Sequence, residues 1–138
     1  MSEKASEKMS IVVSCIDHRF WPETLSLCQK KFGHFDSIQL AGASKNIASA
    51  SNPANKKTLL ENIKIAIKLH LAETLILTNH LDCGAYGGSK NFTSFKEEFD
   101  FHKKELDRAK KIAEKIFPRL KVKTFFVVKN KKGKVEIK

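Results

Sequence analysis

Three side chains of the sequence have the types and the spacing of a metal site. Cys15 follows a short apolar run, and His80 and Cys83 follow another one, three residues apart. Thiolate and imidazole are ligands that zinc prefers, and a His-x-x-Cys turn can chelate one ion. Three ligands leave the fourth position of a tetrahedral zinc open, as in catalytic sites. We therefore predict one Zn²⁺ bound by Cys15, His80 and Cys83.

Two charged residues close to Cys15 extend this chemistry. Zinc lowers the pKa of bound water to about 7, so hydroxide forms near neutral pH. Asp17, two residues from Cys15, can accept the hydrogen of that hydroxide and aim its lone pair, while Arg19 pairs with Asp17 and keeps it ionised. We predict Asp17 and Arg19 as catalytic residues. Without Arg19, Asp17 could itself become the fourth zinc ligand, in a closed form.

Apolar runs alternate with amphipathic segments along the chain, which predicts an α/β fold. The strands are predicted at residues 11–13, 37–40, 74–78 and 122–128, with a last edge strand at 135–137. The helices are predicted at residues 22–32, 53–70 and 92–116. We expect an open, mainly parallel sheet of four strands plus a short edge strand, with helices on both faces.

The predicted sheet explains how residues far apart in the sequence could meet. In an open parallel sheet, functional groups gather at the carboxyl ends of the strands. Cys15 comes directly after the first strand, and His80 comes directly after the third. The turn at Gly42 follows the second strand, and a turn of small residues lets other groups approach the backbone closely. These segments should line one crevice.

The two motifs together resemble those of one family. Cys15-x-Asp17-x-Arg19 and His80-x-x-Cys83-Gly84 are similar to the motifs of the β-class carbonic anhydrases, and Ala41-Gly42 looks like the turn after that family's second strand. The spacing between the motifs, their strand context and the order of elements agree over about Ser10 to Lys138. The chain is therefore identified as a member of this family.

The resemblance carries expectations beyond the residues themselves. It implies a β-carbonic-anhydrase-like fold and the reversible hydration of carbon dioxide to bicarbonate by zinc-bound hydroxide, which the Asp17–Arg19 dyad orients. Gly42 and Gly84 are the expected substrate-binding positions. The family shares its pocket between subunits, so a homodimer is expected. The ten residues before the first strand are too few for the family's amino-terminal helical arm, which predicts a short, divergent member with weak turnover.

The charge balance supports a second hypothesis. Lys and Arg number 26 against 15 Asp and Glu, a net charge of +11, and seven lysines lie between Lys121 and Lys138. Such a tail could bind nucleic acid or an acidic partner in a zinc protein that is not a hydratase. Only three of the basic residues are arginines, which supply most specific base contacts, so a solvated surface is favoured and nucleic acid is not expected. Hydrolysis of another small carbon compound, and thiol redox chemistry between Cys15 and Cys83, stay as alternatives.

Three cysteines, without an apolar leader before them, favour a reducing compartment, and we expect the cytoplasm. No stretch has the length of a membrane span, so no membrane association is expected. The length fits residues 1–10 as a flexible lead-in and 11–138 as a single domain.

The other candidate residues are placed by helical spacing. Cys28 falls on an apolar helix face and is expected to be a core thiol. His70 and His102 also fall on packing faces, so core or boundary positions are expected for both. His18 would point away from Asp17 in an extended segment, which favours a surface position over a proton shuttle. Asp82 and Tyr86 could line the mouth of the crevice or cap its turn, and neither is assigned.

Overall fold

The computed structural model describes residues 8–138, so most of the predicted lead-in at 1–10 lies outside the described residues. In chain order the elements are β1 (Ser10–Ser14), α2 (Trp21–Phe32), β2 (Phe35–Gln39), α3 (Lys45–Ala48), α4 (Pro53–His70), β3 (Thr74–His80), short 3-10 turns η1 (Gly84–Tyr86) and η2 (Ser89–Asn91), α5 (Phe95–Ile116), β4 (Lys121–Lys129) and β5 (Val135–Ile137). No helix among residues 8–138 is long and apolar enough to cross a membrane.

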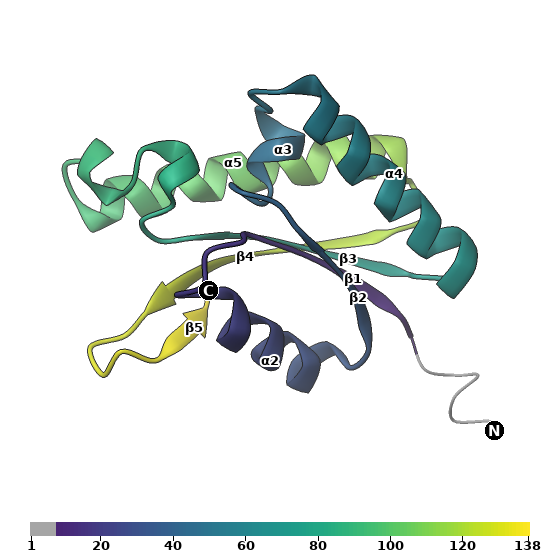
Figure 1. The fold of residues 1–138 in the computed structure, drawn as a ribbon, viewed down its shortest axis with the longest axis horizontal. Helices are drawn as coiled ribbons and strands as arrows, with labels where there is room; N and C mark the ends of the chain where they lie inside the picture. The colour runs from purple at the N-terminus through teal and green to yellow at the C-terminus, as the bar shows by residue number, and fades with distance from the viewer. Residues whose placement is uncertain (1–7) are drawn as a thin grey trace.

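The sheet has five strands in the order β2-β1-β3-β4-β5. β1 pairs in parallel with β2 and β3, β3 pairs in parallel with β4, and β5 runs antiparallel to β4. Helix α2 lies on one face of the sheet, and α3, α4 and α5 lie on the other (Figure 1). The predicted α/β fold, with a mainly parallel sheet, an added edge strand and helices on both faces, is confirmed.

The strand sequences are apolar on both faces because helices cover both. Val12 and Ile76 point to the α2 side and pack with Cys28, which is fully buried, as predicted for a core thiol. Ile11 and Leu77 belong to the larger core on the opposite side, beneath α4 and α5. Each such side chain contributes about 1.5–3 kcal/mol through removal from water, so both layers hold β1 and β3 in place.

Side-chain caps set where two helices begin. The Asn52 side chain accepts a hydrogen bond from the backbone N–H of Ala54 at the start of α4. The Ser94 side chain caps α5 through the N–H of Glu97. The helix expected from residue 92 therefore begins three residues later, at Phe95, because Ser94 caps it. Helix α3 was not predicted at all.

The two histidines expected on packing faces have different outcomes. His102 is fully buried, as expected. His70 is not buried, and the prediction of a core or boundary position is wrong. It lies in the last turn of α4, its side chain is 55% exposed, and its Nδ1 lies 2.7 Å from an Asp36 carboxylate oxygen on the edge strand β2.

Candidate metal centre

The carboxyl ends of β1 and β3 lie side by side and bring the three predicted ligands together. Val13 of β1 is paired with Leu77 of β3, so the residues that follow them emerge at the same edge of the sheet. The ligand atoms of Cys15, His80 and Cys83 all lie within 4.8 Å of one another. Cys15 therefore forms one cluster with His80 and Cys83, which lie at least 65 positions further along the chain, and this cluster could hold a metal ion.

The His80 side chain has one ring nitrogen that is free to bind a metal ion. Its Nδ1 lies 2.6 Å from the Leu81 carbonyl oxygen, to which it donates, so Nε2 carries the free lone pair. That Nε2 is buried and has no hydrogen-bond partner within the described part of the chain. The ring also stacks on Phe20, with centroids 4.5 Å apart. Buried polar atoms are nearly always paired, so this nitrogen fits a coordination bond.

The two thiols complete a donor set that fits zinc. The pKa of Cys15 is lowered to about 4, mainly because the Cys83 thiol donates to it and also because the Gly42 N–H adds a hydrogen bond, against the opposing effect of burial. The Gly42 N–H lies 3.4 Å from the Cys15 sulfur. A thiolate is the form that binds metals. Two cysteines and one imidazole are typical of zinc with one position open.

Asp17 and Arg19 lie against this cluster and pair with each other. The Arg19 Nη2 donates to Asp17 Oδ2 at 2.7 Å, and Arg19 Nε reaches the two carboxylate oxygens at 3.1 and 3.2 Å. This pairing holds the pKa of Asp17 far below its ordinary range, so the group stays ionised. Asp17 Oδ2 also lies 3.7 Å from the Nε2 of His80. The carboxylate thus sits at the edge of the ligand cluster.

Arg19 has a second acidic partner that sequence reasoning left unassigned. Its Nη1 donates to Asp82 Oδ2 and its Nη2 to the Asp82 carbonyl oxygen, both at 2.9 Å. Asp82 adopts the left-handed backbone conformation, with φ +58°. Because the contact joins residues 63 positions apart through an unusual turn, the sequence pattern holds no direct signal for it.

A buried glutamate, which sequence reasoning missed, supports the turn that carries Asp82. Glu98 of α5 is 2% exposed. Its carboxylate accepts from the Asp82 backbone N–H and from the Ser89 hydroxyl, both at 2.8 Å. An acidic residue on the apolar face of a helix was the available signal, since buried carboxylates need donors nearby. Glu98 fixes the turn that carries Asp82 and Cys83 to the core.

Tyr86 belongs to a second buried network behind the cluster. Its hydroxyl donates to Glu105 at 2.9 Å and accepts from the Asn79 side chain at 3.2 Å. The same Asn79 amide nitrogen lies 3.1 Å from Nδ1 of His102. Burial lowers the pKa of His102 to about 4, so that ring is neutral at physiological pH. Tyr86 therefore ties the turn after Cys83 to helix α5.

A pocket of about 410 Å³ opens beside the cluster, and both predicted substrate positions line it. Gly42 has φ +84°, and a Cβ there would lie 2.9 Å from the Cβ of Ala85, so the close turn requires glycine. Gly84 faces open space instead. The lining residues are Cys15, Ile16, Asp17, His18, Arg19, Ala41, Gly42, Gly84 and Ala85.

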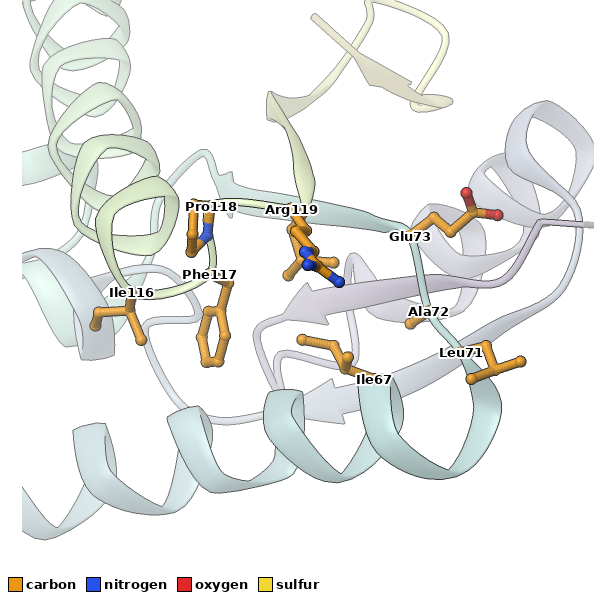
Figure 2. Close-up of a pocket in the computed structure, with 9 residues that line it drawn as sticks. Ile67, Leu71, Ala72, Glu73, Ile116, Phe117, Pro118 and Arg119 are labelled. Carbon is orange, nitrogen blue, oxygen red and sulfur yellow. The ribbon is translucent and has the colours of Figure 1, made fainter.

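A larger pocket, of about 560 Å³, lies at the opposite end of the sheet (Figure 2). Ala72 and Glu73 precede β3, and Leu120 precedes β4, so this pocket adjoins the amino ends of the strands. Its other walls are mostly apolar residues from the ends of α4 and α5, such as Ile67 and Phe117. It holds no cysteine or histidine, whereas the smaller pocket is lined by Cys15, Asp17 and Arg19.

Two solved structures share the fold. A carbonic anhydrase from Glaciozyma antarctica superimposes with a TM-score of 0.61 at 14% identity, over 95% of this chain and 81% of that one. One of the two tetrameric β-carbonic anhydrases of Sordaria macrospora gives 0.52 at 16% identity, over 99% and 84%. The architecture is thus that of β-carbonic anhydrases.

Sequence relatives and a family model cover nearly the same span. Uncharacterised proteins of Rickettsia bellii (strain RML369-C) and Rickettsia conorii (strain ATCC VR-613 / Malish 7) are 32% and 31% identical, over 88% of this chain and 77% and 68% of theirs. The model of the family described as "Putative carbonic anhydrase" matches residues 5–137. The chain therefore belongs to this carbonic anhydrase family, as a divergent member with the β-class fold.

Proposed function

We propose that this protein catalyses the reversible hydration of carbon dioxide to bicarbonate, with one Zn²⁺ held by Cys15, His80 and Cys83. The observation that carries the proposal is the convergence of these three ligand atoms, within 4.8 Å, beside an ionised carboxylate in an open pocket. Bound zinc would supply Lewis acidity, which lowers the pKa of water and makes a nucleophile available near neutral pH.

The role proposed for Asp17 follows from its position. Its Oδ2 lies 3.7 Å from His80 Nε2, where it can accept a hydrogen bond from a hydroxyl group beside the ligand cluster. Arg19 contacts both of its oxygens, so the acceptor is ionised and oriented before substrate arrives. An acceptor that is fixed in advance does not have to reorient during the reaction. Such preorganisation is the main source of electrostatic catalysis.

The role proposed for the glycines is to leave space for a small linear substrate. Gly42 and Gly84 line the same pocket as Asp17 and carry no side chains that would fill it. The side chain of Ile16, which is 58% exposed, adds an apolar surface at the same pocket. Carbon dioxide has no net charge or dipole, so an apolar wall next to an ionised acceptor suits it.

We expect a homodimer in solution. β2 is an edge strand whose outer backbone groups have no neighbouring strand within residues 8–138, and such an edge is a template for pairing with a second copy. The Sordaria macrospora neighbours are tetrameric. Multi-angle light scattering should give at least twice the chain mass of 15.6 kDa. A monomer mass at all accessible concentrations would contradict a shared pocket.

The catalytic proposal is tested by stopped-flow hydration of carbon dioxide with zinc-loaded protein. The rate should exceed that of buffer, rise with pH, disappear after removal of zinc by a chelator, and return when zinc is added back. Protein with one zinc per chain but no rate above buffer at alkaline pH would contradict the hydratase proposal. The site would then serve a non-hydratase zinc protein or another small carbon compound.

A further inference from the structure

Arg19 is held from two sides, and only one of them belongs to the dyad. Asp17 binds its Nε and Nη2, whereas Asp82 binds its Nη1 through the carboxylate and its Nη2 through the carbonyl oxygen. The guanidinium therefore joins the segment after β1 to the turn after β3. Hydrogen bonds between charged partners are about twice as strong as neutral ones, so both anchors matter for where Arg19 lies.

Asp82 is itself fixed to the core. Its Oδ1 accepts from the Ser89 backbone N–H at 2.7 Å, and its own N–H donates to buried Glu98. Each oxygen of its carboxylate thus has a separate task, one toward Ser89 and one toward Arg19. The Asp82 backbone has φ +58°, a conformation that Asp and Asn adopt more readily than most residues. Both its backbone N–H and its carboxylate are therefore held by hydrogen bonds to Glu98 and Ser89.

The anchoring of Arg19 matters because its partner Asp17 lies close to the ligand cluster. Its Oδ2 lies only 3.7 Å from the Nε2 of His80, on the side of the ligand cluster that opens to the pocket. A carboxylate oxygen is among the ligands of zinc, so a rotation of this side chain toward the cluster would make it a candidate fourth ligand. What opposes the rotation is the set of hydrogen bonds from Arg19, which the carboxylate would have to leave.

We propose that Asp82 is a positioning residue that keeps the fourth metal position open: it anchors Arg19, which holds Asp17 away from the metal. The inference rests on the metal site proposed above and deepens it. Asp82 does not itself line the pocket, although Arg19, which it contacts, does. It acts through Arg19 alone, so its effect should depend on the presence of Asp17.

Asp82→Asn separates the two tasks of this side chain. Asparagine tolerates the left-handed backbone, and its carbonyl oxygen can still accept from Ser89. Its amide NH₂ would then face the Nη1 of Arg19, where a donor meets a donor. The variant removes the charged anchor and keeps the turn. Asp82→Gly, which also accepts a positive φ, serves as a second variant if the first does not fold.

The probe is azide, measured by visible absorption of cobalt-substituted protein, since azide can bind only where the fourth position is free. Wild type should bind azide with a clear spectral change, and Asp82→Asn should bind it about tenfold more weakly with cobalt still stoichiometric. In an Asp17→Ala background the Asp82→Asn change should have no effect. Asp107→Asn, which removes an exposed partner of Lys111, is the matched control and should behave as wild type.

Two results would overturn the inference. Wild-type azide affinity in Asp82→Asn and in Asp82→Gly would show that Asp82 does not control the fourth position. An equal loss with and without Asp17 would show that Asp82 only shapes the ligand turn. Azide binding needs no turnover, so it tests this inference separately from the hydratase proposal. If the effect of Asp82→Asn on azide binding depends on Asp17 but the protein does not hydrate carbon dioxide, the hydratase proposal is refuted and this inference stands. A chain that binds no cobalt would overturn both.

Discussion

Cys15→Ser and Cys83→Ser are each expected to lose most of the zinc that the wild-type protein holds. Both sulfurs belong to the cluster of ligand atoms within 4.8 Å. A serine hydroxyl is not ionised at neutral pH and is a poor ligand for zinc, whereas thiolate is among its preferred ones. Elemental analysis of protein purified without chelator should give about one zinc per wild-type chain and only a small fraction in either variant.

Cys28→Ala is the matched control for this loss. Cys28 is fully buried between α2 and the sheet, and burial raises the pKa of its thiol to about 11. The Cys28→Ala variant should therefore keep the metal, and the small cavity that remains should lower its free energy of unfolding. Wild-type zinc content in both Cys15→Ser and Cys83→Ser would refute the ligand assignment. A disulfide between Cys15 and Cys83 in zinc-free, active protein would favour the redox alternative instead.

Asp17→Asn is expected to keep zinc and to lose activity by about 100-fold, the size of effect seen when one oriented polar group is removed from a catalytic site. Asparagine has nearly the shape of aspartate, but one of its two side-chain positions is a donor that faces Arg19. The measurement is kcat/KM for carbon dioxide hydration at matched zinc content. Full activity in Asp17→Asn would contradict its orienting role.

Arg19→Ala extends the same prediction to pH. In the wild type, Arg19 holds the pKa of Asp17 far below its ordinary range, so Asp17 is ionised throughout the working range and does not shape the pH profile. Without Arg19 its pKa rises toward the ordinary value near 4, and the carboxylate remains ionised at neutral pH. It then competes for the metal as hydroxide becomes scarce. The loss of activity should be greatest at and below neutral pH.

The placement of the candidate ligands could be predicted because it depends on strand order and direction. Cys15 and His80 follow two apolar strands, and parallel neighbours present their carboxyl ends at one edge. The strands needed no special local chemistry, since helices bury them on both faces. Helical spacing also placed Cys28 and His102 correctly, since each lies on the helix face that packs against the sheet.

The second set of contacts around Arg19 could not be predicted in the same way. The role of Asp82 depends on a left-handed turn and on an arginine 63 residues away, neither of which a periodic pattern encodes. Glu98 and Glu105, seven residues apart on the buried side of α5, did leave a signal that the sequence analysis overlooked. Both accept hydrogen bonds from polar groups in or next to the turn that carries Cys83.

The most direct test of the account is X-ray absorption at the zinc edge of the purified protein. Zinc bound by Cys15, His80 and Cys83 should show two sulfur neighbours at about 2.3 Å and two nitrogen or oxygen neighbours at about 2.0–2.1 Å. In Cys83→Ser reloaded with zinc, one sulfur neighbour should disappear. A wild-type spectrum without sulfur, a spectrum with four sulfurs, or a protein that retains no zinc would contradict the proposed metal centre.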